Sequence, residues 1–429
     1  MERIDYPALN ESVYRHELPN GLQIYVLVRP EYGKQFAFFA ARYGGMNLRF
    51  RGGDGHWVDT PAGVAHFLEH KMFDTEDGSA TQTLAANGAV DNAFTSADMT
   101  GYYFEGTRGF EENLKTLLSF VSVPYFTTES VEKEQGIIGQ EIRMCDDDPE
   151  NQVYYQLLET MYGQHPIRVR VVGSQESIAD ITPELLYQCH AAFYRPGNMV
   201  LCVAGNVDPD RVAQLAQEIL PKERSGAADA EAGREEPLNA ACSYAECRMP
   251  VSVPLFELGF KGTPAPAGQR LRQRLVAELA CDVLFGASAP LYSRLYEEGL
   301  INNSFDSLYD SVDGCAYLMA GGESRDPERV MEEALQEAAR LAEEGISPQL
   351  WDRLRRAAYG SMVKRLNSLE DTCIELTQGH FDGEEYFRFP ELFHSIEWPD
   401  VAELLRSWCV REQAALSVVW PLEDDPGSD

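Results

Sequence analysis

Alternating and helical hydrophobic periods divide the first half of this 429-residue chain into strands and helices. After a short N-terminal arm, residues 22–28 show the alternation of a strand, and residues 36–43 predict a second strand. Residues 100–105 predict a strand that pairs as a hairpin with the segment 89–96. Apolar residues at helical spacing predict helices over residues 80–87, 110–123, 131–144, 151–162, 177–193 and 209–220, and residues 199–204 predict a further strand.

The stretch 60–74, TPAGVAHFLEHKMFD, predicts one more helix, and this one is expected to be buried. Thr60 is a suitable N-cap and Pro61 suits the first helical position, so the helix is expected to begin there. Its polar residues are flanked by the apolar side chains of Val64, Ala65, Phe67 and Leu68.

Three residues of this helix have the spacing of a metal site. His66 and His70 are four residues apart and share one helix face, with Glu69 beside them. Two imidazoles on one face bind zinc, and the neighbouring carboxylate serves as a proton acceptor. The spacing H-x-x-E-H is the inverse of the commoner H-E-x-x-H. The alternative is that these residues form an ordinary solvated helix face. The helix is expected to be buried, however, and burying imidazoles beside a carboxylate is costly unless they have partners.

The helix predicted over residues 131–144 offers a third metal ligand. Glu134 and Glu141 are seven residues apart and therefore share a face. Zinc held by two histidines takes a third protein ligand and leaves its fourth position to water. We choose Glu141 as that ligand and Glu134 as an auxiliary group near it. A solvated charged face is the alternative for these glutamates together with Glu132.

Composition sets the domain organisation and limits the partners. A chain of this length with 44% hydrophobic residues supports two to three domains. Residues 221–239 contain almost no large apolar residue and predict an exposed linker between domains 1–220 and 240–429. The net charge of −33 argues against nucleic acid or an anionic membrane as a partner. The chain has no membrane-spanning apolar run and no signal pattern, and its nine cysteines lack C-x-x-C spacing, so a cytoplasmic protein with reduced thiols is expected.

The second half repeats the order of the first. Residues 201–212 (LCVAGNVDPDRV) have an echo in residues 317–330 (YLMAGGESRDPERV), each a strand, a glycine turn and a helix start with Asp-Pro. The counterpart of the histidine helix, residues 275–284, contains no histidine. The helix over 347–363 resembles the Glu134/Glu141 helix but has no carboxylate where a third ligand would recur. Duplication followed by loss of the metal site in one half explains this pattern.

Several segments in sequence order resemble the pitrilysin/insulinase family of zinc metallopeptidases, the inverzincins. They are NGLQIYV, GVAHFLEHKMF, NGAVDNAFTS, VEKEQGIIGQEI, HPIRVRVVG and FYRPGNMVLCVAGNVD. The similarity is strong from Asn20 to about Asp208 and weaker in the second half. Within the family, the chain resembles most the bacterial processing-peptidase-like group, whose members are half the length of pitrilysin.

The resemblance implies a fold and a set of roles. The fold is α+β, with two homologous α/β roll domains of the LuxS/mitochondrial-processing-peptidase-like metallohydrolase type, each a mostly antiparallel sheet packed by helices. His66, His70 and Glu141 are the implied zinc ligands, and Zn²⁺ is the implied cofactor. Glu69 is the implied general base, and Glu134 matches a family glutamate that tunes the site without binding the metal.

The resemblance also implies how a peptide binds. The segment 91–96 (DNAFTS) matches the edge strand of the family, to which the substrate adds as an extra β-strand. Asn92 and Ala93, with the adjoining Phe94, are the residues expected to contact the peptide next to the scissile bond. Main-chain pairing of this kind gives affinity with little side-chain specificity.

One departure from the family pattern predicts a partner subunit. Active members carry an Arg and a Tyr seven residues apart in the second domain, and residues 293–305 (SRLYEEGLINNSF) place Leu295 and Asn302 at those positions. Arg294 is one residue off, and its own partner would be Ile301. We therefore predict a heterodimer with a homologue that lacks H-x-x-E-H and supplies the Arg and Tyr.

Two other interpretations of the chain stay open. The first is a non-catalytic scaffold or interaction subunit, as in the respiratory-complex core proteins of the family. The intact His66, Glu69, His70 and Glu141 argue against it. The second is a self-sufficient homodimeric peptidase in which another residue, such as Tyr292 or Tyr296, replaces the missing pair.

Overall fold

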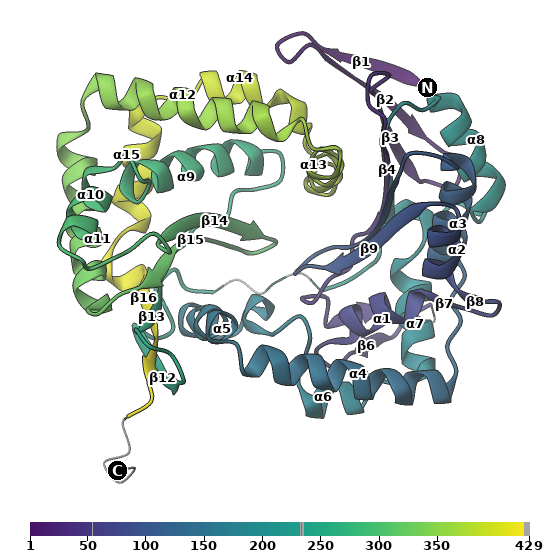
Figure 1. Cartoon of the computed structure of the whole chain (residues 1–429), viewed down its shortest axis with the longest axis horizontal. Helices are drawn as coiled ribbons and strands as arrows, with labels where there is room; N and C mark the ends of the chain where they lie inside the picture. The colour runs from purple at the N-terminus through teal and green to yellow at the C-terminus, as the bar shows by residue number, and fades with distance from the viewer. Residues whose placement is uncertain (54, 232, 234–235, 424–429) are drawn as a thin grey trace. The chain divides into compact units, whose positions relative to one another are not determined.

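The computed structural model describes residues 1–53, 55–231, 233 and 236–423, and these form two compact units (Figure 1). Neither unit is continuous in sequence. The first unit consists of Met1–Ile142, Val169–Ala232 and Val363–Pro390. The second unit consists of Arg143–Arg168, Gly233–Met362 and Glu391–Asp429. The mixture of sheets and helices in each unit confirms the predicted α+β class.

The sheet of the first unit has seven strands, in the order β1-β2-β3-β11-β4-β10-β9. All neighbours are antiparallel except β3 and β11, which are parallel. The first two strands form a hairpin, where the sequence predicted only a short arm. The strands are β1 (Glu2–Tyr6), β2 (Glu11–Glu17), β3 (Gln23–Val28), β4 (Gln35–Ala41), β9 (Ala89–Thr95), β10 (Thr100–Gly106) and β11 (Met199–Gly205).

The sheet of the second unit repeats this topology. Its order is β12-β16-β13-β15-β14, with β12 and β16 parallel and the other neighbours antiparallel. Strand for strand, this matches β3-β11-β4-β10-β9, so β14 is the edge strand that corresponds to β9. The strands are β12 (Tyr244–Met249), β13 (Leu255–Gly262), β14 (Asp306–Val312), β15 (Cys315–Glu323) and β16 (Ala414–Pro421). The helices that follow β11 and β15 both begin with a capping aspartate and a proline, Asp208-Pro209 and Asp326-Pro327, as the sequence echo predicted.

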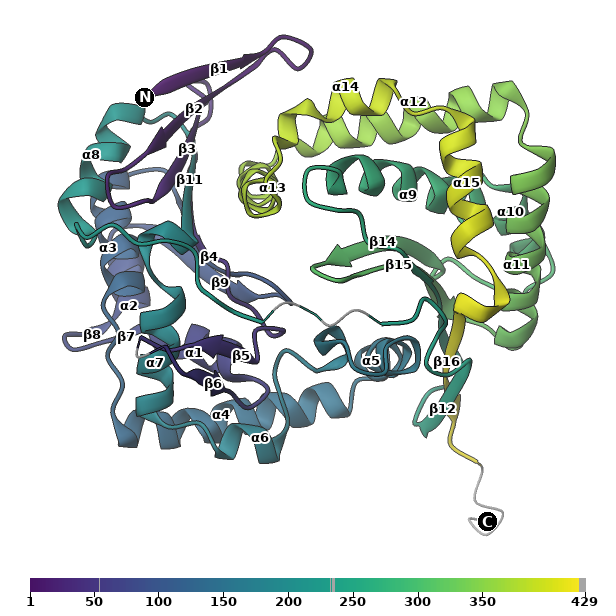
Figure 2. The same cartoon turned by 180° about the vertical axis from the view of Figure 1, so that it is seen from behind.

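One face of the first sheet is covered by helices from the first half of the chain (Figure 2). Side chains of alternate positions on the strands, such as Ile24, Phe39 and Leu201, are fully buried in this layer. The helices are α1 (Val64–Met72), α2 (Ala80–Ala86), α3 (Phe110–Ser122), α4 (Thr128–Asp146), α6 (Gln175–Ala179), α7 (Pro183–Phe193) and α8 (Pro209–Ile219). Two short ladders, β5 (Arg49–Arg51) with β6 (Trp57–Asp59) and β7 (Asp74–Thr75) with β8 (Gly78–Ser79), complete this part.

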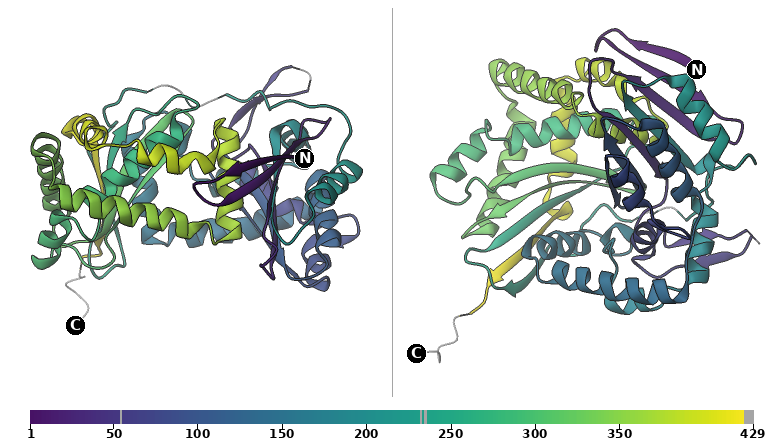
Figure 3. Two further views of the ribbon diagram at one scale, coloured as in Figure 1. Left: turned by 90° about the horizontal axis from the view of Figure 1, so that it is seen from above. Right: turned by 45° about the vertical axis from the view of Figure 1, so that its right-hand side comes forward.

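The other face of each sheet is covered by a helix from the opposite half of the sequence. Helix α13 (Leu369–Asp382) packs against β11 and β4 of the first sheet (Figures 1 and 3). There the hydroxyl of Tyr25 lies 3.0 Å from His380 Nδ1. Helix α5 (Pro149–Met161) packs in the same way against β16 and β13 of the second sheet. The two halves of the chain therefore exchange one helix each.

Helices of the second half cover the remaining face of the second sheet. Helix α9 packs against β14, and α11 and α15 pack against β16 and β13. The face is strongly apolar, with Phe256, Leu258 and Phe260 fully buried. The helices are α9 (Arg270–Leu284), α10 (Pro290–Glu297), α11 (Pro327–Glu344), α12 (Pro348–Arg365), α14 (Phe389–His394) and α15 (Trp398–Trp408). No helix in the described part of the chain is both long and apolar enough to cross a lipid bilayer.

Two predicted helices have different bounds in the structure. Helix α1 begins at Val64 rather than at Thr60, because the Thr60 N–H and hydroxyl donate to Leu48 O and because Gly63, with φ +90°, is the N-cap. The helix predicted over 177–193 is two helices, α6 and α7. They are separated where Thr182 caps a new helix start by accepting the Leu185 N–H.

The predicted linker, 221–239, is hydrogen-bonded over part of its length. Ala228 N–H donates to Asn198 Oδ1, and residue 231 donates to Arg49 O, so the chain runs beside β5. Further on, the Glu236 carboxylate accepts three backbone N–H groups, from residues 163–165. Residues 232, 234 and 235 of the linker, and 424–429 of the predicted second domain, lie outside the described residues.

Because α13 comes from the second half of the chain, we predict that the first half is unstable when it is produced alone. Residues 1–239 produced alone lack α13, so the sheet face that carries Tyr25, Phe38 and Cys202 loses its cover, at about 1.5–3 kcal/mol for each large apolar side chain. We expect this fragment to aggregate or to bind a hydrophobic dye, and co-expression with residues 240–429 to restore a soluble complex. A monodisperse fragment with a cooperative urea transition of its own would contradict this expectation.

Candidate metal centre

Helix α1 brings polar side chains into the interior of the first unit. Its N-cap, Gly63, lies so close to a neighbouring loop that a Cβ there would be 2.7 Å from Val172 O. The helix packs against α7, β9 and β10. As a result His66 and Glu69 are buried, with 8% and 7% of their surfaces exposed.

Three of the predicted residues converge on one point. His66 Nε2 lies 3.5 Å from Glu141 Oε1, and His70 Nε2 lies 3.7 Å from Glu141 Oε2. One ligating atom from each of the three residues lies within 4.8 Å of the others, and they are the one such group in the described residues. Helix α4 thus presents Glu141 to the histidine face of α1.

The other predicted glutamate of α4 contacts the outer side of His70. The His70 Nδ1–H donates to Glu134 Oε1 at 3.1 Å, which leaves Nε2 turned toward Glu141. A carboxylate in this position fixes the tautomer and the orientation of a ligating imidazole. The structure therefore places Glu134 on the Nδ1 side of His70 and Glu141 on its Nε2 side.

The electrostatics of the centre favour a cation. Burial, helped by the charge of His70, lowers the pKa of His66 to about 3, so this imidazole is neutral near pH 7. Burial also lowers the pKa of His70, but the hydrogen bond that His70 donates to Glu134 and the carboxylates of Glu69 and Glu141 outweigh it and raise that pKa overall. Burial raises the pKa of Glu69. His66 is therefore in the neutral state in which an imidazole binds metal, and the carboxylates that raise the pKa of His70 also attract a metal cation.

The donor set fits zinc. Two imidazole nitrogens and one carboxylate are the ligands of catalytic zinc sites that keep a fourth position for water. Zinc–ligand bonds of about 2.0–2.1 Å separate tetrahedral ligand atoms by roughly 3.3 Å. The separations of 3.5 and 3.7 Å between the imidazole nitrogens and the Glu141 oxygens are close to that value. In addition, His66 Nδ1 is buried and has no hydrogen-bond partner among the described residues.

Two residues that the sequence analysis did not single out contact the centre. Thr95, the last residue of β9, donates its hydroxyl to Glu69 Oε2 at 3.0 Å and so links the edge strand to that carboxylate. Lys71, directly after His70, forms ion pairs with Asp74 and, at 3.9 Å, with Glu134. No sequence pattern gave Thr95 this role, because it depends on how β9 lies against α1. The sequence did contain a sign of the role of Lys71, because a lysine within a stretch that is expected to be buried needs a charged partner.

The residues predicted to bind a peptide all lie on β9. This strand pairs only with β10 among the described strands and is therefore an edge of the sheet. Asn92 is exposed, and its Oδ1 accepts the Ala93 N–H at 2.9 Å. Phe94 stacks on Phe38, with ring centroids 5.8 Å apart. The structure thus brings all three to one strand that ends at Thr95, beside Glu69.

The segment 293–305 of the second unit provides no arginine–tyrosine pair. Leu295 is fully buried in α10 and Ile301 is nearly so. Asn302 donates to Glu323 Oε2 at 2.6 Å. Arg294 pairs with Glu333 of α11 at 2.9 Å.

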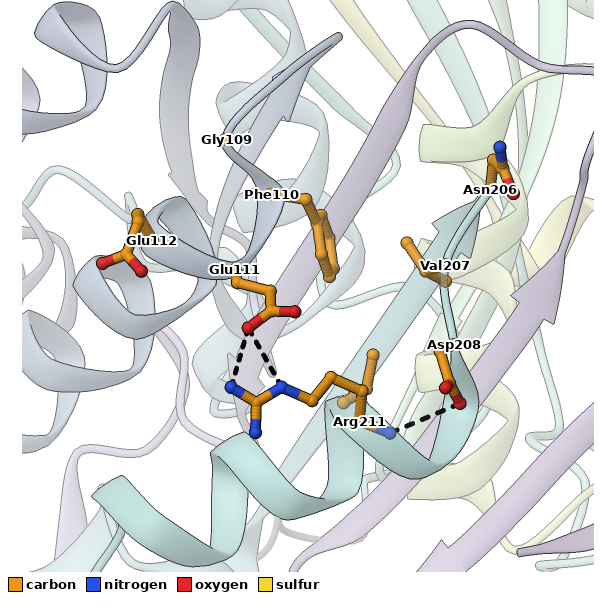
Figure 4. Close-up of a pocket in the computed structure, with 9 residues that line it drawn as sticks. Gly109, Phe110, Glu111, Glu112, Asn206, Val207, Asp208 and Arg211 are labelled. Atoms are coloured by element: carbon orange, nitrogen blue, oxygen red, sulfur yellow. Dashed lines mark hydrogen bonds and ion pairs between the residues drawn. The ribbon is translucent and has the colours of Figure 1, made fainter.

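A pocket of about 340 Å³ lies on the first unit at the N-termini of α3 and α8 (Figure 4). Its one arginine, Arg211, is paired with Glu111 at 2.7 Å, and the remaining charged side chains of the lining are acidic. The pocket contains none of the residues predicted for the site.

Comparisons with known proteins give the same family as the motifs. Residues 53–174 match the family described as Insulinase (Peptidase family M16), and residues 180–358 match the Peptidase M16 inactive domain. The chain is 35% identical to the uncharacterized zinc protease YmfH of Bacillus subtilis (strain 168), over 97% of this chain and 99% of the relative.

Solved structures agree with this result. A putative M16-like peptidase from Alicyclobacillus acidocaldarius superposes with a TM-score of 0.91 at 31% identity, over 96% of this chain and 98% of that one. Pitrilysin has the same fold, with a TM-score of 0.75 at 17% identity, over 97% of this chain and 45% of pitrilysin. The chain therefore belongs to the insulinase (pitrilysin) family, peptidase family M16.

Proposed function

We propose that this chain is the zinc-bearing subunit of an endopeptidase that cleaves short or unfolded peptides. The observation that carries the proposal is the convergence of His66, His70 and Glu141, with Glu69 on the same helix beside them. Membership of a family whose relatives are named zinc proteases supports it. The finer parts of the proposal concern the roles of single residues, the mode of peptide binding and the need for a partner.

The residues of the centre divide the chemistry between them. His66, His70 and Glu141 would hold zinc, which supplies a Lewis acid and lowers the pKa of bound water toward about 7. Glu69 accepts the proton of the attacking water and then passes it to the nitrogen of the leaving amine. Burial raises the pKa of this carboxylate, which makes it a stronger base for the first transfer. The Thr95 hydroxyl holds the carboxylate in place from the edge strand.

The peptide is proposed to bind as an added strand along β9. The free edge of β9 offers main-chain N–H and C=O groups to an extended peptide, which suits many sequences. Because the strand ends at Thr95, a peptide that pairs with Asn92, Ala93 and Phe94 runs toward Glu69. Short or unfolded chains have their main-chain N–H and C=O groups free for such pairing, so they are the proposed substrates.

Glu69→Gln tests the role of the general base. The amide keeps the shape of the side chain but cannot accept the proton, so cleavage of an unstructured fluorogenic peptide should slow by about 10²–10⁴-fold while zinc content stays unchanged. Glu76→Gln changes an exposed glutamate seven residues further on and should leave the rate as it was. Wild-type cleavage by fully zinc-loaded Glu69→Gln protein would refute this mechanism.

Glu141→Gln tests the assignment of the third ligand. Losing one of three protein ligands should weaken zinc binding by more than the 10–100-fold that outer-shell partners cost, as measured by competition with a chromophoric chelator. Glu132→Gln, on the exposed side of the same helix, is the matched control and should bind zinc like the wild type. If both variants bind alike, Glu141 is not a ligand. If the wild type binds no zinc but remains folded, the scaffold interpretation is favoured.

We propose that a partner subunit is needed because the second unit offers no arginine–tyrosine pair for the substrate. At the positions considered for that pair, Leu295 and Ile301 are buried and Arg294 is paired with Glu333. Missing groups that stabilise the transition state cost about 10²–10³-fold in rate. The isolated chain should therefore cleave peptides about 10²-fold more slowly than a mixture with a homologue that lacks H-x-x-E-H and carries the Arg and Tyr. Native mass spectrometry should find one copy of each in the active species.

Equal activity of the lone chain and the mixture would overturn the heterodimer and favour a homodimer. In that case Tyr292→Phe and Tyr296→Phe decide which residue replaces the pair. The two rings stack with centroids 6.0 Å apart, and Tyr296 is the more exposed of them.

A further inference from the structure

The lysine that follows His70 is buried to an unusual degree. The side chain of Lys71 is only 1% exposed, although it carries an ammonium group. Lysine is almost never fully buried unless it is paired, because removing its charge from water costs several kcal/mol. The burial of Lys71 therefore needs an explanation from its partners.

Two carboxylates pair with the Lys71 ammonium. The first is Asp74, three residues further on, where the chain leaves α1 and enters β7. The second is Glu134 of α4, whose Oε2 lies 3.9 Å from Nζ. The other oxygen of Glu134, Oε1, accepts the Nδ1–H of His70 at 3.1 Å. One carboxylate thus joins the lysine of α1 to the metal-facing histidine of the same helix.

The two carboxylates differ in how strongly water screens their interaction with the lysine ammonium. The Asp74 side chain is half exposed, so water already solvates its carboxylate and screens its interaction with the ammonium. Glu134 is largely buried, with 14% of its side chain exposed, and it faces a centre that contains two more carboxylates, Glu69 and Glu141. The ammonium lies nearer to Asp74, but its charge is less screened at Glu134, because Glu134 is the more buried carboxylate.

We propose that Lys71 is a positioning residue of the metal centre that acts through Glu134 on His70. Its ammonium holds the carboxylate in the orientation that receives the His70 Nδ1–H. It also offsets part of the negative charge that Glu69, Glu134 and Glu141 bring together. The inference rests on the proposed zinc site and adds Lys71 to it as a residue that contacts Glu134, which in turn contacts the proposed ligand His70 rather than the metal. Outer-shell partners of this kind are worth about 10–100-fold in metal affinity.

The first experiment measures zinc affinity of the full chain by competition with a chromophoric chelator. Lys71→Met keeps the length of the side chain and removes the charge, and it should weaken zinc binding by about 10–100-fold. Lys115→Met is the matched control, because Lys115 forms an ion pair with Glu112 at the same three-residue spacing on the exposed side of α3. This control should bind zinc like the wild type.

Asp74→Asn separates the proposal from a purely structural role. If Lys71 only ties the end of α1 to Asp74, this variant should weaken zinc binding as much as Lys71→Met does. If Lys71 acts through Glu134, Asp74→Asn should leave zinc affinity within about threefold of the wild type, far from the loss that an outer-shell partner causes. Equal losses in the two variants would overturn the proposal.

A double-mutant cycle with Glu134→Gln tests the route of the effect. Groups that act through one another give non-additive losses, so the double variant Lys71→Met/Glu134→Gln should bind zinc about as well as Glu134→Gln alone. Additive losses would mean that Lys71 acts elsewhere and would overturn the proposal.

Folding and zinc binding are checked separately. The urea midpoint of each metal-free variant shows whether it is folded, and Lys71→Gln replaces Lys71→Met if that variant is not. Wild-type zinc affinity in a folded, uncharged Lys71 variant would overturn the inference and leave the proposed function intact. A folded wild type that binds no zinc would instead remove the proposed function.

Discussion

The burial of charged and polar side chains on helix α1 is the constraint on which the arrangement of the first unit depends. The helix carries His66, Glu69 and Lys71 into a largely apolar interior. Groups of this kind are tolerated inside a protein only when each has a partner, because an unpaired buried charge costs several kcal/mol. Asp74, just after α1, is one of the partners of Lys71, and the other partners come from α4 and β9, so the placement of these two elements is tied to α1.

This dependence joins the metal centre to the edge strand. Glu141 and Glu134 of α4 contact opposite sides of His70, and Thr95 of β9 contacts Glu69. A shift of β9 would therefore disturb the proposed base, and a shift of α4 would disturb the proposed ligand Glu141. A site that must hold its groups within a fraction of an ångström benefits from supports on a helix and a strand rather than on loops.

The sequence was sufficient for those parts of the site that follow from helix geometry. Four-residue spacing places His66 and His70 on one face, and seven-residue spacing places Glu134 and Glu141 on another. Helix geometry does not show that these two faces contact each other, because this contact depends on the tertiary structure. The resemblance to a known family was the basis for predicting it. Periodicity also gave most strands and helices, and the Asp-Pro repeat predicted two equivalent helix starts, at Asp208 and Asp326.

What the sequence could not give depends on contacts between distant segments. Thr60 has the features of an N-cap, but Leu48 O accepts its hydrogen bonds, and so the helix begins after Gly63. The roles of Thr95 and Lys71 depend on which carboxylates lie beside them. The exchange of α5 and α13 between the sheets has no local signal at all, because an amphipathic helix does not specify which sheet it covers.

The second unit shows what the same architecture becomes without metal ligands. Helix α9 packs against the edge strand β14 as α1 packs against β9, and its inner face is made of apolar residues such as Leu275, Leu279 and Val283. Replacing buried charged groups by well-packed apolar side chains is often neutral or stabilising by about 1–4 kcal/mol. Once a duplicated copy no longer had to bind metal, stability alone would favour this replacement. The charged residues inside α1 therefore carry a cost in stability that the apolar inner face of α9 does not, and the proposed metal site is what would offset it.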